Sequence, residues 1–154
     1  MDLRRLRRGE WLALAGALVV IASLFATWYE GPAGGRSGWE AFALLDAVLA
    51  LVAAAGLVLA YQTATRTSPS LPVAAAVVCT VLSLAAVLLV AYRLLQPPGA
   101  NSGVSLGAGA IAGLAGISVL LAGAFLGVRD ETRGAEHMAD VAVQERPAPP
   151  AAAS

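Results

Sequence analysis

The sequence predicts an all-α membrane protein, a bundle of four antiparallel transmembrane helices followed by a disordered C-terminal tail. Of its 154 residues, 58% are hydrophobic and only 13% are charged. That is too little polar surface for a water-soluble domain of this size. The apolar residues also gather in four stretches, each near or above the roughly 20 residues that a helix needs to cross a bilayer. The predicted spans are residues 11–29, 41–61, 72–95 and 104–128, which together make a transmembrane domain at residues 11–128.

Arginines gather on one side of the predicted membrane. The basic segment at residues 1–10, the connection between the second and third spans, and the stretch after the fourth span hold Arg4, Arg5, Arg7, Arg8, Arg66, Arg129 and Arg133. On the other side, Arg36 lies in a connection and Arg93 near a helix end. Because basic residues near span ends stay on the cytoplasmic side, we expect a multi-pass protein of the cell membrane with both termini in the cytoplasm.

A cleaved signal peptide is the alternative for the N-terminus. The first apolar run is long for a signal peptide, and the candidate cleavage site Leu24-Phe25-Ala26 has a bulky residue, Leu24, where a small one is required. We therefore expect the first span to be retained.

Three tryptophans are predicted to anchor the helices at the membrane interfaces, where amphipathic rings prefer to lie. Trp11 begins the first span on the cytoplasmic side. Trp28 and Trp39 flank the first outer connection, which is rich in glycine and contains Pro32. Short connections built from helix breakers favour antiparallel neighbours.

The second span contains the one ionisable side chain well inside a predicted helix, Asp46. An unpaired carboxylate at that depth costs about 1–3 kcal/mol, so such a residue usually faces the bundle interior and finds a partner. The third span starts at Pro72, because the first turn of a helix tolerates proline. This span carries Arg93 at a membrane depth compatible with that of Asp46. Asp46 and Arg93 form a candidate intramembrane polar pair. A structural role for Asp46, either this ion pair or hydrogen bonding to nearby backbone, is favoured over the alternative, a proton or cation relay.

The fourth span has the clearest packing pattern. Its glycines, with Leu120 in the place between the third and fourth of them, recur every three or four residues, which places them along one helix face where another backbone can approach closely. The candidate packing residues are Gly109, Gly113, Gly116, Gly123 and Gly127. The second span has a similar row at Ala43, Ala47, Ala50 and Ala54. We expect these two faces to build the chain's own bundle, with a dimer interface as the alternative.

After Val128 the composition becomes polar and charged, and the chain ends in a proline- and alanine-rich stretch. We therefore predict that residues 129–154 form a disordered cytoplasmic tail. A weak helix between Gly134 and Gln144 is the alternative within that segment.

The sequence offers no set of residues for catalysis or metal binding. His137 is the single histidine and Cys79 the single cysteine, so no His-based site and no intramolecular disulfide are expected. We expect no enzyme activity, no cofactor and no metal. The N-terminal arginines directly precede a span, where they act as an orientation signal and contact anionic lipid, so no nucleic acid is expected as a partner.

Several segments resemble a known group of proteins. The resemblance rests on Trp28-Tyr29, on the SGWEAF segment at residues 37–42, and on Leu45-Asp46, and it extends over most of residues 8–131. These segments are similar to a group of small, uncharacterised four-helix integral membrane proteins that is common in actinobacteria. The resemblance implies the four-helix topology and the source group, and it implies no activity.

Two functions remain. The favoured one is a non-enzymatic accessory or assembly protein that acts through helix–helix association, as a homo-oligomer or with a membrane-protein partner in the lipid bilayer. The alternative is a small transporter or channel subunit that works as an oligomer and uses the membrane-embedded Asp46.

Overall fold

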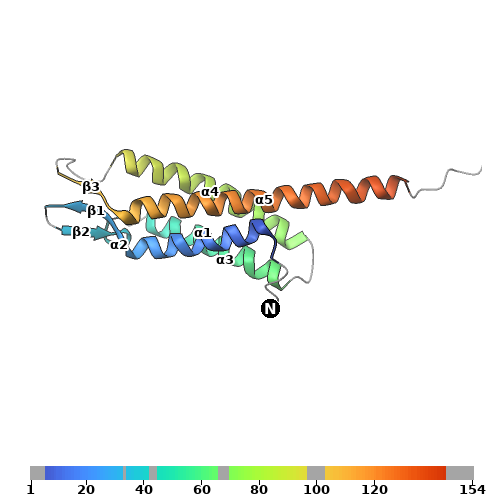
Figure 1. The fold of residues 1–154 in the computed structure, drawn as a ribbon, viewed down its shortest axis with the longest axis horizontal. Coiled ribbons are helices and arrows are strands. Elements are labelled where there is room, and N and C mark those ends of the chain that lie inside the picture. Colours follow the sequence, from blue (N-terminus) through green and yellow to red (C-terminus); the bar gives the residue numbers. More distant parts are fainter. Residues whose placement is uncertain (1–5, 33, 42–44, 66–69, 97–102, 145–154) are drawn as a thin grey trace, which may run out of the picture.

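The computed structural model describes residues 6–32, 34–41, 45–65, 70–96 and 103–144. In this part of the chain, four helices are long and apolar enough to cross a membrane, which confirms the central prediction from the sequence. They are α1 (Arg8–Phe25), α3 (Leu45–Ala64), α4 (Ser70–Leu95) and α5 (Ala108–Gln144), and they lie side by side (Figure 1).

The first helix is shorter than predicted. The α1 helix starts just after Arg7, whose backbone N–H donates to the carboxylate of Glu10, so the helix N-terminus is capped. It ends at Phe25, and β1 (Thr27–Gly31) follows. The predicted span 11–29 was therefore too long at its C-terminal end, because a run of β-branched and aromatic residues is as apolar as a helix but favours a strand.

A small antiparallel sheet, with strand order β2-β1-β3, closes one end of the helices. It was not predicted from the sequence. In it β1 pairs with both β2 (Gly34–Ser37) and β3 (Ser105–Leu106). Gly31 pairs with Gly34 at the β1–β2 turn, and Gly34 has a φ of +108°, a conformation that glycine adopts at no steric cost. The two connections expected to be irregular outer loops are thus joined by backbone hydrogen bonds.

The second and fourth predicted spans are displaced toward the C-terminus. A short helix, α2 (Gly38–Ala41), precedes the second long helix, which starts at Leu45 and ends at Ala64. Residues 42–44, at the start of the predicted span 41–61, lie outside the described residues. In the fourth predicted span, 104–128, the first residues belong to β3, and α5 starts only at Ala108.

The α5 helix continues well beyond the predicted membrane boundary. Its 37 residues run without a break to Gln144, and Figure 1 shows this extension projecting past the other helices. The prediction of disorder from Arg129 was therefore wrong for residues 129–144, whereas 145–154 lie outside the described residues. Alanine and glutamate favour helix even without a buried apolar face, and disorder was predicted from polarity alone.

The helices pack in a definite order. The α1 helix contacts both α5 and α3, while α4 contacts α3 and α5. A Cβ atom built on Gly9 would lie 2.9 Å from the backbone nitrogen of Gly127, and one built on Gly16 would lie 2.6 Å from the carbonyl oxygen of Gly116. Residues with increasing numbers in α1 contact residues with decreasing numbers in α5, so these two helices are antiparallel. The core is apolar and includes Val20, Leu49, Val90 and Leu120.

Candidate functional site

Asp46 lies in the first turn of α3 and is almost completely buried, with 3% of its surface exposed. Its Oδ1 atom makes no hydrogen bond with any described residue. Most buried polar atoms in proteins have a partner, so an unsatisfied carboxylate oxygen is unusual. The sequence analysis expected Asp46 to face the interior, and the structure places it there.

The structure does not bring Asp46 and Arg93 together. Within the described residues, no hydrogen bond or ion pair joins the Asp46 carboxylate to the guanidinium of Arg93. Instead, the hydroxyl of Tyr29 donates to the backbone carbonyl of Arg93 at 3.0 Å. The last carbonyls of a helix lack partners within it, and this bond satisfies one of them while tying β1 to the end of α4. The proposed pair is therefore replaced by a Tyr29–Arg93 contact. Burial raises the pKa of Tyr29, and the nearby charge of Arg93 partly offsets that rise.

Trp28 is a core residue and not an interface anchor, which corrects the prediction. Its exposed fraction is zero, and its indole N–H donates to the carbonyl of Ser23 at 2.7 Å. The β1–β2 register shifts between Thr27 and Tyr29. Such a bulge breaks the two-residue alternation, which allows both Trp28 and Tyr29 to be buried.

The room for the Trp28 ring comes from two glycines of α5. A Cβ atom on Gly113 would lie 2.6 Å from Cζ2 of Trp28, and one on Gly109 would lie 2.8 Å from Cδ1. The glycine spacing predicts a helix-packing face but does not indicate the aromatic partner. A tryptophan near a strand, together with a GxxxG pair in a later span, is the signal that could have suggested this contact.

Trp11 and Trp39 are half-exposed, at 47% and 48%. The ring of Trp39 packs against Phe25 at the end of α1, with ring centroids 6.1 Å apart and planes tilted by 59°. The interface-anchor role stays a prediction for these two residues.

The SGWEAF segment has a structural explanation over its described residues, 37–41. The carboxylate of Glu40 accepts hydrogen bonds from the backbone N–H of Ser37 at 2.9 Å and from its hydroxyl at 3.1 Å. These bonds cap the short α2 helix and hold the pKa of Glu40 below its usual value. A Cβ atom on Gly38 would lie 3.1 Å from Nε1 of Trp28, so the segment also packs against the buried tryptophan.

The glycine face of α5 packs against α1 and the strand that follows it, not against α3. Besides the two glycines at Trp28, a Cβ atom on Gly116 would lie 2.8 Å from Cγ1 of Val19, and one on Gly123 would lie 2.5 Å from the carbonyl oxygen of Gly9. Gly127 is different, because its Cβ atom would meet only Cβ of Ala76, at 3.9 Å.

The alanine row of α3 is not the inward face of that helix. Ala47 and Ala54 are exposed, and Ala43 lies outside the described residues. Leu49, Val52 and Ala53 are buried in their place. The prediction that the alanine row is a packing face of the chain's own bundle was therefore wrong for Ala47 and Ala54.

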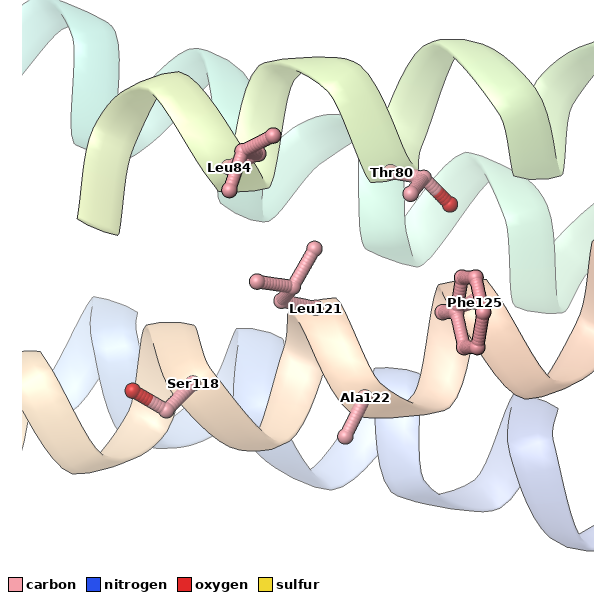
Figure 2. A pocket seen from close by; sticks show the side chains of 6 residues that line it. All are labelled: Thr80, Leu84, Ser118, Leu121, Ala122 and Phe125. Atoms are coloured by element: carbon pink, nitrogen blue, oxygen red, sulfur yellow. The ribbon is translucent and has the colours of Figure 1, made fainter. Parts of the chain in front are cut away.

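A groove of about 490 Å³ lies between α4 and α5. Figure 2 shows the six residues that line it, Thr80, Leu84, Ser118, Leu121, Ala122 and Phe125. The hydroxyl of Thr80 donates to the carbonyl of Ala76 at 2.7 Å, and that of Ser118 donates to the carbonyl of Leu114 at 2.8 Å. Because both hydroxyls are bonded within their own helices, the groove presents an almost entirely hydrocarbon surface.

The described residues contain no group of three or more histidine, cysteine, aspartate or glutamate side chains that could hold a metal ion.

Comparison of the chain with protein-family models, with curated proteins and with solved structures finds no match. The resemblance to a group of actinobacterial membrane proteins stays a prediction.

Proposed function

We propose that this chain is an integral protein of the cell membrane with four antiparallel transmembrane helices and both termini in the cytoplasm. The four long apolar helices support insertion, and the arginine distribution supports the orientation. The two ends assigned to the cytoplasm also lie together, because Gly9 at the start of α1 contacts the α5 backbone at Gly127. The extension of α5 to Gln144 would then project into the cytoplasm.

We further propose that the protein is a non-enzymatic accessory or assembly subunit that acts through helix–helix association. The observation that carries this proposal is that buried hydroxyl groups form hydrogen bonds within their own helices. Ser23, Thr63 and Ser83 are buried, and each donates to a carbonyl of its own helix, at 2.7, 3.1 and 2.6 Å. Such local bonding consumes the polar groups that a pathway or a reactive centre would need. The bundle is therefore best suited to presenting apolar surfaces.

The outer face of α4 is the candidate surface for association. The glycine face of α5 packs against α1 and β1 inside the chain, which favours another surface over the dimer interface considered from the sequence. Of the four long helices, α4 is the least covered by the others. Its side chains Val77, Val81 and Leu88 are 44%, 62% and 64% exposed.

Affinity capture of the full chain from membranes in mild detergent tests this proposal. We expect a foreign membrane protein in stoichiometric amount, and we expect Val81→Asn to release it while the chain itself stays folded. Exposed Val58 on α3 provides the matched control, Val58→Asn, which should retain the partner. A pure homodimer, or equal capture by both variants, would contradict the accessory role.

A small transporter or channel subunit is the second candidate. The observation that favours it is the buried Oδ1 atom of Asp46, which makes no hydrogen bond with any residue that the structure describes. An ionisable residue inside a membrane is a candidate functional site by default. Proton-coupled or cation flux in reconstituted vesicles tests it. Flux that is present in the natural chain and abolished in a folded Asp46→Asn variant would establish this alternative, and equal background leakage in both would end it.

A further inference from the structure

We infer that the α4–α5 groove is a binding site for one anionic phospholipid, whose acyl chain lies in the groove and whose phosphate binds Arg129. The inference rests on the proposed membrane orientation and goes beyond the accessory role, because an assembly protein does not require a specific lipid. Three features of the described residues carry it: the shape and chemistry of the groove, its alignment with Arg129, and the position of Arg129 at the end of the apolar part of α5.

The groove fits a hydrocarbon chain. Its volume of about 490 Å³ lies within the range of roughly 300–1,000 Å³ that is typical of small-molecule sites. Leu84, Leu121 and Phe125 supply apolar walls, and Figure 2 shows that side chains of α4 and α5 face each other across it. The hydroxyls of Thr80 and Ser118 are engaged with their own helices, so nothing in the lining calls for a polar ligand.

The groove leads directly to a cationic residue. Arg129 follows Phe125 by four positions, Ala122 by seven and Ser118 by eleven, so the four residues share one helix face. All four are exposed. The distance along the helix from Ser118 to Arg129 is about 16 Å at 1.5 Å per residue. That length is close to half of the roughly 30 Å hydrocarbon core, so the groove and Arg129 together match the depth of one leaflet.

Arg129 is placed where a phosphate would be. The apolar part of α5 runs from Ala108 to Asp130, so Arg129 stands at its polar boundary. The guanidinium of Arg129 makes no hydrogen bond or ion pair with any described residue. Asp130, the neighbouring carboxylate, lies about 100° further around the helix, away from this face. The cytoplasmic leaflet is rich in anionic lipid, which supplies both the phosphate and the chain.

Native mass spectrometry of the full chain in mild detergent tests the inference, with phosphatidylglycerol and phosphatidylcholine of identical acyl chains added in equal amounts. We expect one bound lipid and a preference of about fivefold for phosphatidylglycerol, since one arginine near a membrane surface contributes about 1 kcal/mol. Arg129→Gln should abolish the preference and leave lipid binding in place. Arg36→Gln, at an exposed arginine on β2, is the matched control and should keep the preference.

Two further measurements distinguish the phosphate of a lipid from free phosphate, and a lipid in the groove from a protein. Ala122→Leu narrows the groove and should lower the binding of both lipids, whereas inorganic phosphate at millimolar concentration should displace neither. Displacement by phosphate would mean that Arg129 binds a free anion without the groove, which overturns the inference. An unchanged preference for phosphatidylglycerol in Arg129→Gln would also overturn the inference. A bound protein in place of lipid would do the same, if that protein is lost in Ala122→Leu. Labelling of a Thr132→Cys variant from outside the cell would overturn the orientation alone, because the detergent measurement does not depend on it.

Discussion

Two glycines that look equivalent in the sequence should respond in opposite ways to the same substitution. Gly123 and Gly127 form one GxxxG pair on α5, but their surroundings differ. A Cβ atom on Gly123 would lie 2.5 Å from the carbonyl oxygen of Gly9 and 2.9 Å from Cα of Ala13. Both of those atoms belong to the α1 backbone, so relief requires that the two helices separate. On Gly127 the nearest atom would be Cβ of Ala76 at 3.9 Å, which is ordinary van der Waals contact.

The magnitude follows from comparing Gly123→Ala with Gly127→Ala. Replacing glycine by alanine inside a helix stabilises it by about 1 kcal/mol, and this gain is common to both variants. Only Gly123→Ala adds an overpacking cost, which is typically about 1–3 kcal/mol. We therefore expect Gly127→Ala to be up to about 1 kcal/mol more stable than the natural chain. Gly123→Ala should be less stable than Gly127→Ala by about 1–3 kcal/mol.

Equilibrium unfolding by sodium dodecyl sulfate in mixed micelles measures both free energies, with helicity as the signal. Ala115→Gly, at an exposed position of the same helix, checks that the helix-propensity term has its expected size in this micelle. If Gly123→Ala and Gly127→Ala agree to within about 0.5 kcal/mol, the usual error of such comparisons, the close α1–α5 contact is refuted.

Three other experiments test the site residues. Trp28→Phe removes the 2.7 Å bond to the Ser23 carbonyl and should lower the free energy of unfolding by about 1 kcal/mol or more; an unchanged free energy would contradict the buried position of the indole. Asp46→Asn and Arg93→Gln should be additive to within about 0.5 kcal/mol in a double-mutant cycle, because no described contact joins them; a larger coupling energy would restore the ion pair. The hydrogen bonds of Glu40 depress its pKa in the folded state. They therefore stabilise the protein at pH values above the unfolded pKa, and this stabilisation is lost as the pH falls through the folded pKa. The difference in melting temperature between the natural chain and Glu40→Gln should therefore shrink with acidification across that window, and a constant difference would argue against the cap.

The helices were predictable from the sequence to the extent that hydropathy alone defines them. Hydropathy does not distinguish an apolar strand from an apolar helix end, and for that reason residues 27–29, the first part of β1, were included in the first span. It also carries no information about polar helices, so the helix of residues 129–144 was predicted only in part, as the alternative of a weak helix between Gly134 and Gln144. Both errors lie at helix ends, and the central parts of the four long helices fall within the predicted spans.

The candidate site was predictable one residue at a time but not in its contacts. A lone aspartate in an apolar helix implies burial, and Asp46 is buried. That Arg93 does not pair with it could not be inferred, because depth in the membrane does not fix the direction in which the Arg93 side chain leaves its helix. Trp28 was misplaced for a related reason: an aromatic residue near a span end fits a membrane interface, and only the register shift in β1 turns it inward.

Cysteine accessibility in intact cells tests the membrane topology most directly. In a Cys79→Ala background, single cysteines replace three exposed residues, Arg36 on β2, Ser105 on β3 and Thr132 on the extension of α5. With both termini in the cytoplasm, an impermeant maleimide should label Arg36→Cys and Ser105→Cys in sealed cells, and should label Thr132→Cys only after permeabilisation. Labelling of Thr132→Cys in sealed cells, or failure to label both sheet positions, would contradict a four-span protein with cytoplasmic ends.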